Sequence, residues 1–541
     1  MRHLVLPLVS LALALGAPPR AAAQAVPGTL IMALPADPRP VPYLIRNTSD
    51  ADVADQLFLR LAGLGATLRT TGDDAMQPEL AERWVRRDSL TLEFTLDARA
   101  RWHDGTPVTS RDVTFAWQLI HQPALGVDLA PFAMIAAVEA IDDRRFAVRF
   151  RRPSVEQVYH VAFQLQPMPA HLLARIPAES LATSAFTAAP VGNGPYRFER
   201  RVPGQVTELR AVDEHFRGRP GIARVLFRTI PDGTARFNAL LSGEIDVMGD
   251  LSPTQAQQAR QRPTLRIVAE PHNLVTYLLY NARVPGDTAR AHPILADRRV
   301  REALALALDR RVVATGAFGS STLAPDAVRS QAWNWLGGVP APARANLRAA
   351  RALLAEAGWR DTDGDGVLDR NGAPLELRII YPGPSASRSV IAVQVERMLD
   401  AAGVRAVLEP LEGPVWFAKR RAGDFDIDIS AVNQDASPYS LVQAWSCTAA
   451  SQPITSNVGR WCDAEFDRLL AGAATQRDPN AGYRAALERM ADWRPAVVVA
   501  APINIVAVHT RLEQVRIRPI KAFTDLWRWR VRPGAALARD R

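Results

Sequence analysis

Lysine is almost absent from this chain of 541 residues, although the chain is basic. Lys419 and Lys521 are the only lysines, so the other 63 of the 65 basic residues are arginines. A formal net charge of +9 would suit a nucleic-acid partner. The arginines, however, stand singly or in pairs beside acidic residues and form no continuous basic stripe, which phosphate binding needs. The composition therefore predicts no nucleic-acid partner, and we attribute the arginine excess to genome composition.

Hydrophobic runs long enough to cross a membrane as a helix, about 20 residues, are also lacking. The longest candidate at the start, Leu4 to Ala17, is shorter, follows Arg2, and precedes the small residues 21–23. This order is typical of a secretory signal peptide, which we assign to residues 1–25, with cleavage after residue 23 or 25. No cysteine follows the run for lipid attachment. We expect a soluble product exported to a bacterial periplasm.

A second apolar stretch, residues 496–508, is interrupted by Pro502 and Asn504. It is too short and too polar for a membrane span. Its pattern instead predicts a buried strand.

Cysteine is limited to Cys447 and Cys462, which lie 15 residues apart. An oxidising compartment favours a disulfide between them, and a loop of this size would gain about 3 kcal/mol from it in the chain-entropy model. Two buried thiols are the alternative. A zinc site is disfavoured because neither cysteine has a further Cys or His at ligand spacing.

Motifs of nucleotide and hydrolytic chemistry are missing as well. Neither lysine stands in a phosphate-binding Gly-Lys-Ser/Thr context, and Gly192-Asn193-Gly194 continues into Pro195, where a dinucleotide-binding loop needs a helix. No Gly-x-Ser-x-Gly turn and no His-Glu-x-x-His pair occur. We therefore expect no enzymatic activity and no cofactor, with an exported hydrolase built from distant residues as the alternative.

What the chain does contain is a regular alternation of helices and strands. Length alone would suit three to four domain-sized units, and 48% hydrophobic residues are enough to form their cores. Apolar spacing predicts helices over 49–64, 110–120, 347–357, 388–402 and 463–471. Strands are predicted over 28–34, 90–96, 144–150, 224–230, 375–381, 404–411 and 425–432. The pattern indicates an α/β fold.

A short acidic segment has the spacing of a metal site. Asp361, Asp363 and Asp365 occupy positions 1, 3 and 5 of a calcium-loop pattern, with Asp369 further on. Position 12 is Gly372, so the glutamate that closes such a loop is missing. The segment is read as a polar turn between a helix and a strand, with a structural calcium ion as the alternative.

Several ordered motifs resemble one known family. A strand is followed by a tight Asp-Gly turn and then by a capped helix, in which Thr109 is placed to satisfy free amides. The residues of this signature are Ala81-Glu82, Trp84, Thr91–Leu96, Trp102–Thr109, Asp112-Val113 and Phe115. It resembles extracytoplasmic solute-binding family 5, the dipeptide-, oligopeptide- and nickel-binding proteins of ABC importers. Further matches are Gly192–Tyr196, Pro231–Val247, Asp297–Arg310, Leu353–Trp359 and Asn457–Asp467.

The resemblance implies a two-lobed periplasmic-binding-protein fold of the class II type with an additional inserted α/β domain. Lobe I would comprise residues 26–65, 188–275 and 497–541. The inserted domain would be 66–187 and lobe II 276–496. Such proteins close over a ligand in the cleft, and two chain crossings between the lobes would allow a hinge motion.

The resemblance also implies an aspartate that binds a ligand's amino group, within a Gly-Trp-x-x-Asp context. Asp435 stands at the matching position, with Ala431-Val432 replacing Gly-Trp and Pro438 one residue early. A loop-capping role is the alternative for Asp435. Tyr439, Trp445 and Trp461 could line the pocket or pack around the cysteine pair.

These observations together predict a monomeric periplasmic substrate-binding protein that captures a short peptide or similar polar solute and delivers it to an ABC permease. A non-peptide ligand on the same scaffold, such as an oligosaccharide, a metal chelate or an opine, is the main alternative.

Overall fold

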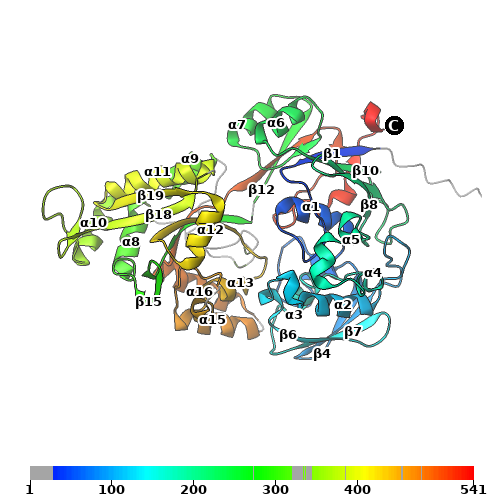
Figure 1. Cartoon of the computed structure of the whole chain (residues 1–541), viewed down its shortest axis with the longest axis horizontal. Coiled ribbons are helices and arrows are strands. Elements are labelled where there is room, and N and C mark those ends of the chain that lie inside the picture. The colour runs from blue at the N-terminus through cyan, green and yellow to red at the C-terminus, as the bar shows by residue number, and fades with distance from the viewer. Residues whose placement is uncertain are drawn as a thin grey trace, which may run out of the picture.

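The computed structural model describes residues 28–271, 273–319, 333, 336, 344–383, 385–452, 455–476 and 478–540. The signal peptide assigned to residues 1–25 lies outside this part of the chain. Two bodies stand side by side, with a smaller sheet beneath one of them (Figure 1). No helix among the described residues combines the length and the apolar character that a membrane crossing requires.

The first unit is built on a mixed sheet of seven strands in the order β12-β22-β11-β1-β10-β9-β8. Its strands are β1 (Thr29–Leu34), β8 (Tyr196–Val202), β9 (Val206–Ala211), β10 (Arg224–Thr229), β11 (Val247–Met248), β12 (Leu265–Pro271) and β22 (Ile503–His509). Its helices are α1 (Thr48–Leu57), α6 (Gly233–Leu241) and α7 (Pro253–Arg260). Apolar residues of α6 and α7 pack on β12 and β22. We call this the seven-stranded unit.

The second unit is an antiparallel sheet in the order β4-β5-β7-β6. Its elements are β4 (Ala81–Asp88), β5 (Thr91–Leu96), β6 (Ile135–Ala140), β7 (Arg145–Phe150), α2 (Ser110–Ile120), α3 (Gln157–Ala162), α4 (Ala170–Leu173) and α5 (Ala185–Ala188). The hairpin β2 (Ala62–Leu64) and β3 (Met76–Pro78) precedes it. Phe94 and Phe146 stack in its core at 5.2 Å between ring centroids. We call this the four-stranded unit.

The third unit is a sheet in the order β19-β18-β20-β13-β21. Its strands are β13 (Leu274–Tyr280), β18 (Glu376–Pro382), β19 (Arg405–Leu411), β20 (Ile427–Asn433) and β21 (Ala496–Ala500). Its helices are α8 (Arg298–Ala307), α9 (Arg310–Phe318), α10 (Leu347–Glu356), α11 (Ala386–Asp400), α12 (Gly413–Ala422), α13 (Ser440–Trp445), α14 (Cys447–Ser451), α15 (Ala464–Thr475) and α16 (Asn480–Trp493). We call this the five-stranded unit.

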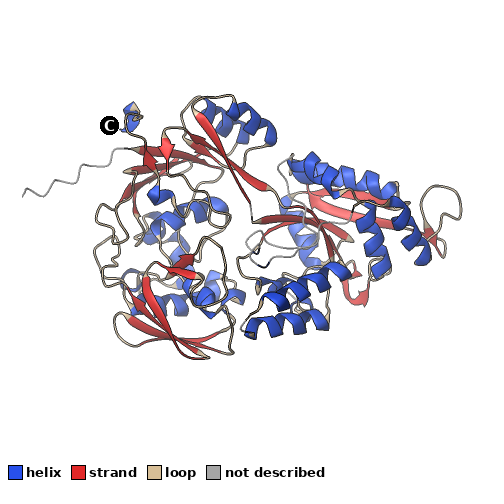
Figure 2. Ribbon diagram, turned by 180° about the vertical axis from the view of Figure 1, so that it is seen from behind, coloured by secondary structure: helices blue, strands red, loops and turns tan. Residues whose placement is uncertain are grey.

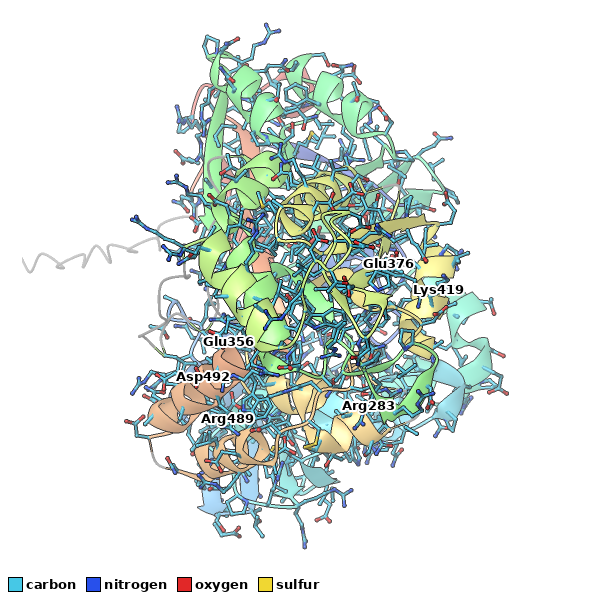
Figure 3. All side chains as sticks on the ribbon, turned by 90° about the vertical axis from the view of Figure 1, so that its left-hand side faces the viewer. Arg283, Glu356, Glu376, Lys419, Arg489 and Asp492 are labelled. Atoms are coloured by element: carbon cyan, nitrogen blue, oxygen red, sulfur yellow. A yellow bond between two sulfur atoms is a disulfide. The ribbon has the colours of Figure 1, made fainter. Side chains whose placement is uncertain are left out.

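Helices surround this third sheet. Apolar residues of α8, α9, α10 and α11 share one core with the sheet. Figure 2 shows the helices and strands of all three units from behind. Figure 3 shows the far end of the five-stranded unit, with Lys419 of α12 and Arg489 and Asp492 of α16 at its surface. Short pairs complete the fold: β14 (Arg283–Val284) with β15 (Asp287–Ala291), β16 (Asp369–Arg370) with β17 (Ala373–Pro374), and β23 (Leu512–Glu513) with β24 (Arg530–Val531).

The chain crosses between the seven-stranded and five-stranded units twice, between β12 and β13 and between β21 and β22. The second crossing differs from the expected boundary at residue 496, because Ala496–Ala500 pairs with β13 in the five-stranded sheet. Residues 496–508 therefore form two strands in two sheets and not one buried strand. Pro502 lies between them, where a residue without an N–H cannot continue a ladder.

Candidate functional site

A cavity of about 490 Å³ lies where the three units meet. That volume is within the range of sites that enclose small molecules. The seven-stranded unit contributes residues 32–35, 247–250, 504 and 518–523 together with one face of α1. The five-stranded unit contributes Asn273 and Asn433–Ala436, and the four-stranded unit contributes Tyr159, Phe163 and Gln164.

Strand ends place these segments around the cavity. β1 and β11 run parallel, and the residues at and after their carboxyl ends, Leu34-Pro35 and Gly249-Asp250, line it. In the other sheet β20 ends at Asn433, and the next three residues form the facing wall. Crevices at the carboxyl ends of strands are the usual binding position in open α/β sheets.

Asp435, the residue expected to bind an amino group of the ligand, lies on this wall. Its Oδ1 accepts hydrogen bonds from the Tyr159 hydroxyl at 2.7 Å and from the Ser437 N–H at 2.7 Å, and its Oδ2 accepts one from Gln164 at 3.1 Å. Burial raises the pKa of Asp435, and these donors act in the opposite direction. Because Tyr159 and Gln164 belong to the four-stranded unit, the carboxylate joins two units at the cavity.

A second buried acid links the same two units. The Oε2 atom of Glu156 accepts hydrogen bonds from the hydroxyls of Ser437 at 2.8 Å and Tyr483 at 3.2 Å. Burial raises the pKa of Glu156 to about 7, although its hydroxyl donors lower it. The Val155 N–H also donates to the Ala474 carbonyl at 3.0 Å. The contact between the units is therefore polar and sensitive to protonation.

The three aromatic residues expected in the pocket do not line this cavity. The Tyr439 hydroxyl accepts a hydrogen bond from Arg152 at 2.6 Å, in the contact between the units. Trp445 packs between Tyr277 and Trp461, with ring centroids 6.1 and 6.5 Å apart. All three side chains are buried in the core. Trp445 and Trp461 thus take the alternative expected for them, packing beside the cysteine pair, whereas Tyr439 lies between two units.

Comparison with known proteins accounts for this architecture. The family model for the middle part of bacterial extracellular solute-binding proteins, family 5, matches residues 75–452. The chain belongs to this family. The oligopeptide-binding protein AppA of Bacillus subtilis is 24% identical over 450 residues, which cover 81% of this chain and 80% of AppA.

Solved structures of the family have the same fold. The structure of AppA from Bacillus subtilis in complex with a nonapeptide matches with a TM-score of 0.77 at 23% identity, covering 93% of this chain and 99% of AppA. That of NikZ from Campylobacter jejuni in complex with Ni(L-His) matches with a TM-score of 0.76 at 19% identity, covering 93% and 99%. The two-lobed fold inferred from the motifs is thus confirmed.

In this family 5 protein the two cysteines are joined in a disulfide bond. The bond connects the start of α14 to the residue before the N-cap of α15. Trp461, next to Cys462, contacts Phe466 with ring centroids 5.1 Å apart. The disulfide therefore lies beside the aromatic core and away from the cavity.

The acidic segment forms an exposed loop. Ligand atoms of Asp361, Asp363 and Asp365 lie within 4.8 Å of one another. Asp361 accepts N–H groups of the loop itself, Gly364 at 2.7 Å and Gly366 at 3.1 Å. The Asp369 carboxylate accepts hydrogen bonds from the N–H of Thr362 at 2.9 Å and from its hydroxyl at 2.7 Å. The carboxylates thus serve as loop-closing acceptors, and calcium binding stays a prediction.

Two basic residues that the sequence did not single out, Arg60 and Lys521, line the other side of the cavity, and both lie close to Asp55. The Asp55 carboxylate lies 3.5 Å from Arg60 and 3.4 Å from Lys521. Burial lowers the pKa of Lys521. This residue also has a φ of 57°, in the left-handed region that non-glycine residues rarely adopt. The sequence did contain a hint of Lys521, because it is one of only two lysines in an arginine-rich chain.

Proposed function

We propose that this protein is the substrate-binding component of an ABC importer, which captures a short peptide or a similar polar solute between its lobes and delivers it to the permease. The names of relatives, the AppA–nonapeptide structure and the position of the cavity support this function. Binding without chemical conversion is sufficient for the role. Export through a cleaved signal peptide to the periplasm, without a lipid anchor, and action as a monomer belong to the same proposal.

The observation that carries the proposal is the position of Asp435 in a cavity enclosed by three units. Among the described residues, its Oδ2 accepts one hydrogen bond, from Gln164. A carboxylate oxygen accepts more than one donor, so Oδ2 retains capacity for an ammonium group. A peptide amino terminus would supply a charge-assisted bond and compensate the buried negative charge. We assign the amino terminus of the ligand to this atom.

Lobe closure completes the proposed function. The seven-stranded and four-stranded units would form lobe I with its inserted domain, and the five-stranded unit lobe II. Two crossings, next to Pro271 and Pro502, would provide the hinge. Tyr159 and Gln164 reach Asp435 from across the cleft, so ligand capture and closure would use the same carboxylate. The ligand shifts the equilibrium by its difference in affinity for the two states.

Thermal unfolding of residues 26–541 with added tetra-alanine tests the proposal. At a ligand concentration of 100 Kd, stabilisation of about 2.7 kcal/mol is expected. N-acetylation of the peptide and the substitution Asp435→Asn should each reduce the shift. Asp492→Asn, the same charge change at an exposed position of α16 (Figure 3), should leave the shift unchanged.

Two results would contradict the proposed peptide-binding function. A melting temperature that no peptide raises, but that an oligosaccharide, a nickel–histidine chelate or an opine does, would replace the peptide by that ligand. Turnover of an added peptide would contradict a purely binding role.

A further inference from the structure

Helix α1 presents two carboxylates on one side. Asp52 and Asp55 are three residues apart, which places them on the same helix face. Asp55 is compensated, because Arg60 and Lys521 both lie within 3.5 Å of its carboxylate. Asp52 lines the cavity itself, one turn closer to the start of the helix. The two acids therefore have different surroundings.

The Asp52 carboxylate has neither a hydrogen bond nor an ion pair with any of the residues that the structure describes. Burial, with the charges of Asp55 and Asp250, raises its pKa to about 8, although Lys521 acts in the opposite direction. Asp250 lines the same cavity, and its φ of 55° is in the left-handed region. The wall beside α1 thus holds a half-buried acid that has no paired counter-ion among the described residues, and a second acid close by.

The cations of the cavity wall do not compensate Asp52. Arg518 is paired with Asp525 at 2.7 Å. Arg236 donates to two main-chain carbonyls, those of Ile230 and Pro231, each at 2.7 Å. Lys521 is closest to Asp55. Among the described residues, the cavity therefore holds three carboxyl groups without a paired cation, those of Asp52, Asp250 and Asp435, and a cationic group of the ligand would stabilise their ionised forms.

We propose that Asp52 is a specificity-determining residue that binds an ammonium or guanidinium group on a peptide side chain, so that the protein prefers peptides containing lysine or arginine. This inference rests on the proposed function, since it assigns a second cation site in the same cavity. Asp435, on the facing wall, would take the amino terminus. Asp250 would strengthen the negative potential of the cavity without contacting the side-chain cation of the peptide.

Protonation gives this site a measurable signature. At pH 7 an acid with a pKa near 8 is mostly protonated in the free protein. An ammonium group in contact with Asp52 favours the ionised carboxylate, so a lysine peptide should release close to one proton more than its norleucine counterpart, which reaches Asp435 alone. A site that only packs against the aliphatic part of a lysine side chain would release no additional proton.

The experiment is a calorimetric titration of residues 26–541 at pH 7. The probes are tetra-alanine peptides with lysine placed at each position in turn, and the same peptides with norleucine in place of lysine. Titrations in two buffers of different ionisation enthalpy give the number of protons released. In the unmodified protein, one lysine peptide should bind roughly tenfold or more tightly than its norleucine counterpart.

The variant Asp52→Asn should reduce this preference to within about threefold and remove the additional proton release of the lysine peptide, with little change in affinity for norleucine peptides. Asp492→Asn, at an exposed position of α16, should behave as the unmodified protein does. If lysine and norleucine peptides bind equally well and release the same number of protons, the inference is wrong and the peptide function stands. If no peptide binds, the proposed function fails and the inference with it.

Discussion

At the scale of single residues, Arg511 holds the chain ends of the seven-stranded unit together. Its guanidinium donates to both oxygens of Asp246 at 2.8 Å and to Asp540 at 2.8 Å. Asp540 in turn accepts the N–H of Thr29 at the start of β1, and Asp246 that of Ile31. All three charged side chains are buried. Their partners are distant in sequence, so no local pattern in the chain predicts this cluster.

Replacing Arg511 with methionine should therefore be costly. The variant keeps much of the volume but leaves two carboxylates in the interior without their main counter-ion, which destabilises by about 3–5 kcal/mol. Urea unfolding of the purified variant measures the loss. Arg83→Met is the control, because the side chain of Arg83 is 65% exposed on β4 and should change stability by less than about 1 kcal/mol. Equal effects of the two substitutions would contradict the account.

At the scale of elements, the predicted and observed boundaries agree where local signals decide them. The helix expected over 110–120 is α2, Ser110–Ile120, with the N-cap at Thr109. The Asp112 carboxylate accepts the Thr109 N–H at 2.8 Å, which fixes the first turn. The strand expected over 90–96 is β5, Thr91–Leu96, whose alternating side chains enter a core. Caps and period-two alternation are local, so sequence reasoning finds them.

The helix expected over 49–64 ends seven residues early because a distant segment terminates it. α1 stops at Leu57, whose carbonyl accepts the N–H groups of Asn193 at 2.9 Å and Gly194 at 2.7 Å. The Leu59 N–H then donates to the Asn193 side chain at 2.8 Å. The turn that begins at Gly192 thus clamps the end of α1. Leu59 and Asn193 are more than 130 residues apart in the sequence. Helical periodicity reports only on neighbouring residues, so it could not predict where α1 ends.

This packing predicts a strong effect at Gly192. A Cβ atom there would lie 2.0 Å from the Leu57 carbonyl oxygen and 2.8 Å from its carbon. Backbone atoms cannot rotate away, so Gly192→Ala should destabilise by at least about 1–3 kcal/mol. The measurement is the urea midpoint. Gly413→Ala is the matched control, because its Cβ would meet no atom within 4 Å. An unchanged midpoint for Gly192→Ala would show that the turn is not clamped.

The candidate site also contains residues that local sequence signals reveal and residues that only distant contacts reveal. Asp435 was predicted because a motif offset marks it, and the structure places it on the cavity wall. Tyr439 and Trp445 were expected there too, but Tyr439 lies in the contact between two units and Trp445 packs between Tyr277 and Trp461. Asp52 carries no motif. Its role as a candidate site residue can be recognised only in the folded protein, where α1 lies close to Lys521 and Asp250 from two other parts of the chain.

At the scale of the whole molecule, Glu156 couples the four-stranded unit to the five-stranded unit through Ser437 and Tyr483. The raised pKa of about 7, against 4.5 in its ordinary state, means that the folded contact binds a proton more tightly than the unfolded chain. The stabilisation from this group is full below about pH 4.5, declines as the pH rises and is lost once the pH has passed about 7. The contact should therefore be tightest in mildly acidic solution.

The substitution Glu156→Gln tests this pH dependence. Glutamine keeps the shape and cannot ionise, so the variant should lose less stability than the unmodified protein between pH 5 and pH 8. The difference between the two proteins should reach up to about 3 kcal/mol, which follows from the size of the pKa shift. Melting temperatures at the two pH values measure it. Parallel pH profiles for the two proteins would assign the pH dependence to other groups.

The most direct test of the central claim is a crystal structure of residues 26–541 in complex with the tetra-alanine peptide. We expect one peptide enclosed between the lobes, with its amino nitrogen about 2.7–2.9 Å from Oδ2 of Asp435. A peptide bound outside the cavity, or one whose amino terminus points away from Asp435, would contradict it.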